Sequence, residues 1–91
     1  MITTTIIMAL VTMYGATGNP MANGQMPYVG AAACPRNIPL ETKVMIYDVT
    51  FTCADRTAKK YDGRFDLYSE GTRKQMLRFG KKKTEVKLLT K

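Results

Sequence analysis

The residues of this chain best suited to chemistry are aspartates that lie close together. Three of its four aspartates, Asp55, Asp62 and Asp66, fall within twelve residues. Asp66 stands between Phe65 and Leu67, and on a strand these two apolar side chains share one face while Asp66 points to the other. If that other face lines a groove, the carboxyl group loses water and its pKa rises, which suits a general acid. Asp55 ends the preceding predicted strand and can lie alongside.

The same carboxyl groups also have a structural interpretation. Backbone amides, or the side chains of Arg56 and Arg64, can satisfy Asp55 and Asp66, which would then hold loops together. Asp62 precedes a glycine, and because Asp-Gly is typical of a tight turn, we interpret it as a turn residue. Spacing alone does not separate the catalytic from the structural interpretation.

The composition excludes much other chemistry. The chain has no histidine, which removes Ser-His-Asp and Cys-His arrangements and imidazole catalysis near neutral pH. Its two cysteines, Cys34 and Cys53, are too few for a Cys-rich zinc site and fit either one disulfide or two buried thiols. We therefore expect no metal and no cofactor.

Length and charge indicate one small basic domain. The 91 residues are 45% hydrophobic and 23% charged, as in folded proteins, and suffice for a single domain over 1–91. Fourteen Lys and Arg against seven Asp and Glu give a net charge of +7. This charge favours anionic partners such as nucleic acid, acidic lipid or anionic cell-wall polymer.

Clusters of β-branched and alternating apolar residues predict several short strands. The Thr, Ile and Val residues between positions 2 and 13 predict one or two of these strands. The same segment lacks the basic residues of a signal peptide and is too short to span a membrane. Turn-forming residues over 15–30 predict a long structured loop, at which Tyr14, Asn23 and Tyr28 either line a groove or pack the loop. The predicted strands span 2–13, 29–33, 42–47, 49–54, 61–68 and 84–89.

One helix is predicted near residues 70–79. Ser69 or Thr72 can cap its start, Gly80 can end it, and Leu77 belongs to an apolar stripe that also includes Met76 and Phe79. Many short strands with a single helix and no internal repeat predict an all-β fold, a small closed or nearly closed β-barrel.

Two stretches, in order along the chain, resemble the 3D (Asp-Asp-Asp) domain family. Residues 31–46, AAACPRNIPLETKVMI, are similar to the family pattern VAVDPxxIPLGTxVxI. Residues 53–55 and 64–68, CAD and RFDLY, are similar to the beginning and end of AEDTGGAIKGNRIDLY, with the same eleven-residue step between aspartates. With 12–14, 21–24 and 73–89, the resemblance covers about residues 10–90.

This resemblance implies a six-stranded double-psi β-barrel, related to rare lipoprotein A, expansins and the catalytic domain of membrane-bound lytic transglycosylase A. Asp66 falls on the third family aspartate and Asp55 on the second, so these two are the expected catalytic residues, while Cys34 occupies the position of the first. The family fold places the strands that carry Cys34 and Cys53 side by side near the site, which favours a disulfide between them.

In such families an aspartate on the barrel acts on the β-1,4 bond between cell-wall sugars. With the first aspartate replaced, we expect lytic cleavage, in which one residue protonates the leaving oxygen and then accepts a proton from the sugar's own hydroxyl. Hydrolysis normally needs two carboxylates. The residues expected to contact the substrate are Tyr14, Asn23, Lys43, Arg64 and Tyr68.

Two alternative functions would use other residues of the chain. A polysaccharide-binding or phage structural module on the same barrel would depend on the tyrosines Tyr14, Tyr28, Tyr61 and Tyr68 more than on Asp66. Nucleic-acid binding through the basic residues of 73–83 is not expected, because a solvated basic surface is their commoner role. A cell-wall substrate implies action outside the cytoplasm, and phage delivery would explain the missing signal peptide. The sequence predicts no oligomeric state.

Overall fold

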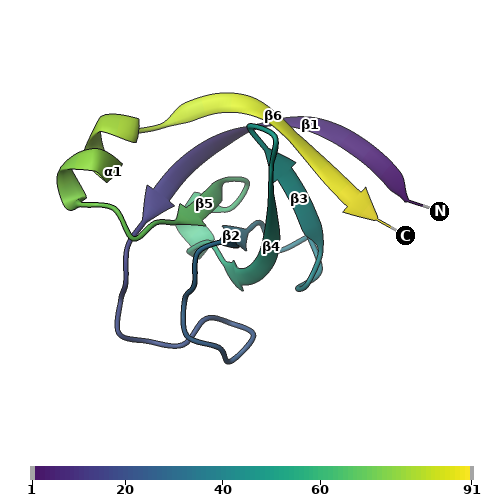
Figure 1. Cartoon of the computed structure of the whole chain (residues 1–91). Coiled ribbons are helices and arrows are strands. Elements are labelled where there is room, and N and C mark those ends of the chain that lie inside the picture. Colours follow the sequence, from purple (N-terminus) through teal and green to yellow (C-terminus); the bar gives the residue numbers. More distant parts are fainter. Residues whose placement is uncertain (1, 91) are drawn as a thin grey trace.

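Six strands close into a barrel in the computed structural model, which describes residues 2–90. The order around the barrel is β1-β5-β2-β4-β3-β6 (Figure 1). Two neighbouring pairs, β1–β5 and β2–β4, are parallel, and the other four are antiparallel. The prediction of an all-β barrel with one short helix is confirmed. The strands are β1 (Thr3–Tyr14), β2 (Ala31–Cys34), β3 (Lys43–Ile46), β4 (Val49–Arg56), β5 (Phe65–Tyr68) and β6 (Lys82–Thr90).

A long two-stranded ribbon joins the two ends of the chain. β1 pairs antiparallel with β6 from Thr3 opposite Thr90 to Val11 opposite Lys82, and Figure 1 shows this ribbon arching over the shorter strands. The run of Thr, Ile and Val residues in β1 favours extended backbone because branched side chains fit a pleated surface. The start of the chain therefore forms one strand.

The larger of two clusters of buried residues lies on the inner face of the barrel and follows the two-residue period of its strands. Val11, Val44, Ile46, Phe65 and Val86 are fully buried or nearly so. A disulfide between Cys34 on β2 and Cys53 on β4 lies within this cluster, and both side chains are completely buried. Of the two alternatives that the cysteines left open, the structure has the disulfide.

Turn residues set the limits of the strands more sharply than the apolar pattern does. β3 ends at Ile46 because Tyr47 and Asp48 both have positive φ angles, 51° and 61°, as in the two-residue turns of tight hairpins. Tyr61 was expected in the strand that contains Phe65, but it lies in the single-turn 3₁₀ helix η1 (Lys59–Tyr61). The Asp62-Gly63 turn separates the two, so β5 begins only at Phe65.

The helix α1 (Arg73–Phe79) begins later than the predicted residue 70. Thr72 is its N-cap, and its hydroxyl accepts from the Gln75 N–H while the Gln75 side chain accepts from the Thr72 N–H. This capping box fixes the start. Of the predicted apolar stripe, Leu77 is wrong because it is 69% exposed, whereas Met76 and Phe79 are half-buried. Phe79 alone packs against the core.

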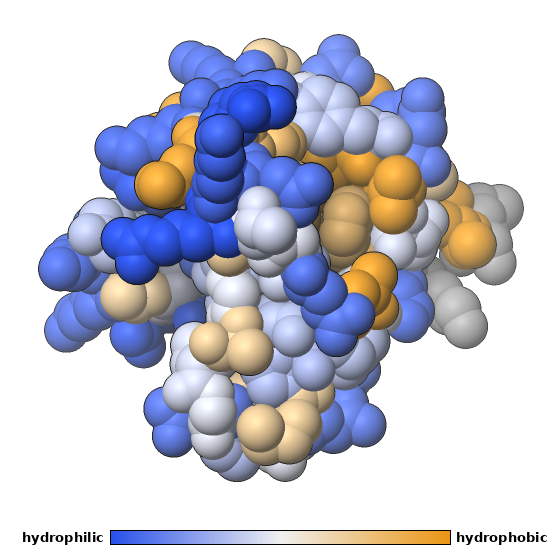
Figure 2. Space-filling view, turned by 60° about the vertical axis from the view of Figure 1, so that its left-hand side comes forward, coloured by the Kyte–Doolittle hydropathy of each residue, from blue (hydrophilic) through white to orange (hydrophobic). Residues whose placement is uncertain are grey.

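The predicted loop over residues 15–30 contains no helix or strand. It is held to the barrel through Met21, which is buried, and through the Asn23 N–H, which donates to the Ala54 carbonyl at 3.1 Å. Figure 2 shows that the face with α1 turned forward is mainly hydrophilic, with small hydrophobic patches. No helix within residues 2–90 has the length and apolar character needed to cross a membrane.

Candidate functional site

Four side chains form one row across the outer face of the barrel. Thr12 on β1 pairs with Asp66 on β5, Asp66 pairs with Ala33 on β2, and Ala33 pairs with Asp55 on β4. Directly paired residues of neighbouring strands point to the same face of a sheet. The two aspartates therefore lie on either side of Ala33, two strand spacings apart, which is about 10 Å between their Cα atoms.

An irregularity in β4 brings Asp55 into this row. Ala32 pairs with Cys53, but its neighbour Ala33 pairs with Asp55, so Ala54 is an extra residue in the ladder. Such a bulge changes the direction in which the following side chain points. Cys53 thus stays in the core while Asp55 reaches the outer face.

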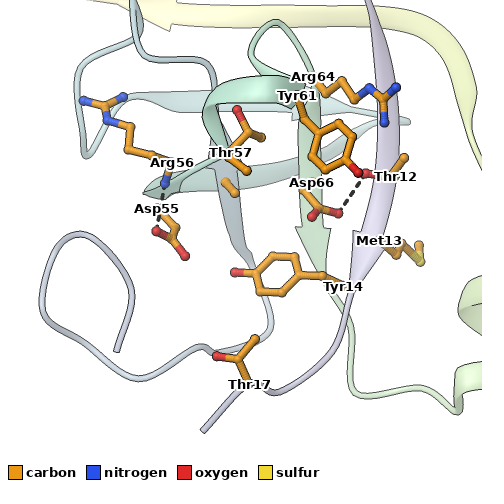
Figure 3. Close-up of a pocket in the computed structure, with 12 residues that line it drawn as sticks. Thr12, Met13, Tyr14, Thr17, Asp55, Arg56, Thr57, Tyr61, Arg64 and Asp66 are labelled. Atoms are coloured by element: carbon orange, nitrogen blue, oxygen red, sulfur yellow. Dashed lines mark hydrogen bonds between the residues drawn. The ribbon is translucent and has the colours of Figure 1, made fainter. Parts of the chain in front are cut away.

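A cavity of about 380 Å³ lies over the row (Figure 3). Ala33 forms its floor, and because alanine is small, the space between the two aspartates stays open. The volume is in the range of small-molecule sites. The cavity is lined by Thr12, Met13, Tyr14, Thr17, Ala33, Asp55, Arg56, Thr57, Ala58, Tyr61, Arg64 and Asp66.

Asp66 has the properties of a proton donor. The Thr12 hydroxyl donates to Oδ1 of Asp66 at 2.8 Å, as the dashed line in Figure 3 shows. Burial raises the pKa of Asp66, and the negative charge of Asp55 adds to this rise, whereas the Thr12 hydrogen bond and the charge of Arg64 oppose it. The net pKa is above the ordinary aspartate value. Asp66 therefore holds its proton at a higher pH than a solvated carboxyl group.

Asp55 is engaged with the backbone. Its Oδ1 accepts from the N–H of Arg56 at 2.8 Å and from the N–H of Ala22 at 3.0 Å. Ala22 belongs to the 15–30 loop, so Asp55 fastens this loop to the end of β4. The structural interpretation considered above describes this carboxyl group well. The partner is the backbone of Arg56 and not its guanidinium, which donates to the carbonyls of Pro35 and Ile38.

Tyr14 closes the cavity from the side of the loop. Burial raises the pKa of Tyr14 to about 12, with further contributions from the charges of Asp55 and Asp66, so the phenol is protonated at neutral pH. Its hydroxyl contacts Met21 Sδ at 3.8 Å, and its ring meets the edge of the Tyr68 ring at a centroid distance of 5.6 Å. Tyr68 is almost fully buried and does not line the cavity, so it supports Tyr14.

A second aromatic ring lies on the Asp66 side of the cavity. Tyr61 is partly exposed, and its ring is flanked by the guanidinium carbon of Arg64 at 4.8 Å and by Nζ of Lys60 at 5.0 Å, measured to the ring centroid. Such cation–π contacts restrict the ring and place positive charge at the cavity mouth. Figure 3 shows Tyr61 above the Thr12–Asp66 pair.

The structure thus brings four of the predicted site residues together: Tyr14, Asp55, Arg64 and Asp66. Lys43 lies outside this cavity and donates to Thr52 at 2.5 Å.

Asn23 also lies outside, with its side chain bound to Gln25 at 2.9 Å and to Glu41 at 3.2 Å. Cys34, expected near the site, points into the core instead, because it alternates with Ala33 along β2.

Three lining residues carry roles that sequence reasoning did not assign. Thr12 donates to Asp66, Ala33 provides the floor, and Thr57 is buried with its hydroxyl lacking a hydrogen-bond partner. The alternation of β1 could have indicated Thr12, since it shares a face with Tyr14. Within residues 2–90, no three cysteine or acidic side chains gather in a way that would hold a metal ion.

Comparisons with known proteins returned no relative. No protein-family model, no curated protein and no solved structure matches the chain significantly. What the site can do is therefore inferred from its own residues and from the motifs described above.

Proposed function

We propose that the chain is a 3D-type double-psi β-barrel domain that cleaves the β-1,4 glycosidic bond of peptidoglycan as a lytic transglycosylase. The observation that carries the proposal is the position of Asp66. Its carboxyl group lies in a small cavity, hydrogen-bonded to Thr12, with burial raising its pKa. A general acid for a sugar leaving group needs this combination of access and retained proton.

A single carboxyl group can complete lytic cleavage. The proton of Asp66 moves to the glycosidic oxygen as the bond from that oxygen to C1 breaks. The C6 hydroxyl oxygen of the same sugar then bonds to C1, and its proton passes to the Asp66 carboxylate. The product is a 1,6-anhydro sugar, no water is consumed, and Asp66 ends in its starting state.

The state of Asp55 favours this route over hydrolysis. A hydrolase needs a second carboxylate to activate water or to attack C1. Asp55 lies two strands away and already accepts two backbone N–H groups, and these hold it as part of the loop attachment. We assign Asp55 a positioning role that also contributes negative charge near Asp66.

The two tyrosines of the cavity suit a sugar substrate. Tyr61 and Tyr14 offer ring surface and a phenol donor, and Arg64 supplies positive charge beside them. The two parallel strand pairs of the six-stranded barrel are compatible with the double-psi topology that the resemblance implies. Since peptidoglycan lies outside the inner membrane, the proposed site of action is the cell wall.

The test is the product spectrum of purified peptidoglycan after incubation with the chain, measured by mass spectrometry. Asp66→Asn keeps the size of the side chain and can still accept from Thr12, but it cannot donate the proton. Asp48→Asn is the matched control, because it makes the same change in a turn whose positive φ asparagine tolerates. Circular dichroism verifies that each variant is folded.

We expect anhydro-muropeptides from the unmodified chain and from Asp48→Asn, and none from Asp66→Asn. Products with reducing ends would overturn the lytic route and assign a second catalytic role to Asp55. If the folded, unmodified chain releases no products, the enzyme proposal is wrong.

A further inference from the structure

Eight of the twelve residues of β1 are paired on one side only. Thr3–Leu10 pair with β6, but β5 joins the opposite edge of β1 only from Val11 onward. Within the part of the chain that the structure describes, no strand lies along that opposite edge of Thr3–Leu10. An edge of this kind presents backbone N–H and C=O groups that can pair with another strand. Figure 1 shows this part of β1 extending beyond the short strands.

The outer face of the same segment is apolar. Ile2, directly before the strand, and Ile6, Met8 and Leu10 within it are 62, 56, 56 and 37% exposed. Their spacing of two or four residues places them on one face of β1. Exposed apolar side chains beside an unpaired strand edge are typical of an interaction surface rather than of a free surface.

The segment also lacks the usual protection of an edge strand. No Lys, Arg, Asp or Glu occurs before Arg36, so the whole of β1 is uncharged although the chain carries 21 charged residues. Edge strands that must stay unpaired commonly carry a lysine or a proline. A strongly acidic or basic partner strand would find no complementary charge on this edge. A neutral, apolar strand needs no such charge and fits the edge better.

We propose that this edge is a homodimer interface, in which β1 of one protomer pairs antiparallel with β1 of a second copy. A two-fold axis at Ile6 pairs Ile6 with itself, Thr4 with Met8, and Ile2 with Leu10. Each of these pairs joins two even-numbered residues, whose side chains all point to the outer face of β1. The apolar side chains of both copies therefore stay on one face of the joined sheet. This register uses the whole free edge.

The charges of β6 fall at the rim of such an interface. Lys87 lies opposite Ile6 within each protomer, and Glu85 lies opposite Met8. In the dimer the two Lys87 residues are three strand spacings apart, about 14 Å, which exceeds the screening length of about 8 Å in physiological salt. An apolar centre with a charged rim is the usual composition of a protein interface. The proposal is independent of the function of the cavity.

The first test is sedimentation velocity over a series of protein concentrations. We expect the unmodified chain to form dimers and Met8→Lys to be monomeric, because pairing would take the water from a lysine charge among apolar side chains. Leu77→Lys is the matched control, since it places the same charge on another exposed apolar position, in α1, and should leave the dimer intact. A chain that stays monomeric at every concentration, or a Met8→Lys variant that dimerises normally, overturns the proposal.

The second test fixes the register. In Ile6→Cys the two new thiols lie opposite each other, and a short bifunctional maleimide should join the protomers. In Leu10→Cys they are eight residues apart along the pair, about 27 Å, so this variant should stay unlinked. The native cysteines do not interfere, because both are buried in the disulfide. Equal cross-linking of both variants contradicts the proposed pairing.

Discussion

Reduction of the Cys34–Cys53 disulfide is the perturbation whose effect on stability follows most directly from the structure. The bond joins neighbouring strands of the core and closes a segment with a sequence separation of 19 residues. The chain entropy that a closed loop of this length removes from the unfolded state corresponds to about 3 kcal/mol. Both side chains are fully buried in the folded state.

The expected loss is therefore about 3 kcal/mol in the free energy of unfolding, or about 12 to 24 °C in the thermal midpoint for a domain of this size. The assay is urea unfolding followed by circular dichroism, with and without a phosphine reductant. Because no solvent reaches the bond in the folded protein, the reductant must be added to the unfolded chain before refolding.

The double variant Cys34→Ala/Cys53→Ala is the control, since it lacks the bond and should not respond to the reductant. If reduction of the unmodified chain changes the free energy of unfolding by less than about 1 kcal/mol, the loop-closure argument is wrong. The unfolded chain then gains little conformational freedom when the bond is reduced.

Three further changes have expected outcomes that the same unfolding assay measures. Asp66→Asn should stabilise the chain at pH 7. Burial raises the pKa of Asp66 in the folded state, so above about pH 4 the carboxyl group ionises more readily in the unfolded state, and its ionisation destabilises the fold. This advantage should shrink at pH 3, where Asp66 is protonated in both states, and an advantage independent of pH would contradict the assignment. Glu41→Gly should stabilise by about 1 kcal/mol, because Glu41 has a φ of 73° that costs a residue with a Cβ more than glycine, whereas Glu41→Ala should bring no gain. Thr57→Val should also stabilise by about 1 kcal/mol, since it replaces an unpaired buried hydroxyl with a methyl group, and destabilisation would mean that the hydroxyl has a partner.

Much of the fold was predictable because it depends on local rules. The alternation around Asp66 places Phe65 and Leu67 in the core and the carboxyl group on the outer face, as expected. Thr72 was one of two candidate caps, and its glutamine partner three residues later distinguishes it from Ser69.

The parts that were not predictable depend on contacts between distant segments. The pairing of Ala33 with both aspartates requires the strand order and the bulge at Ala54, and neither leaves a local signal. The same holds for Lys43, whose place on β3 keeps it away from the cavity. Leu77 fits a helical stripe, but α1 lies on the surface of the barrel, and of this stripe only Phe79 packs against the core.

The row at the cavity shares its strands with the larger core cluster but lies on the opposite face of them. Three of its four members are next in sequence to a residue of that cluster: Asp66 to Phe65, Thr12 to Val11 and Ala33 to Cys34. Replacement of a row residue can therefore change the chemistry of the cavity while the core stays as it is. Insertion or deletion of one residue in these strands has the opposite effect, since it turns the aspartate inward and the phenylalanine outward. Evolution or engineering of this barrel can proceed by substitution within the row, while changes of length are confined to its loops.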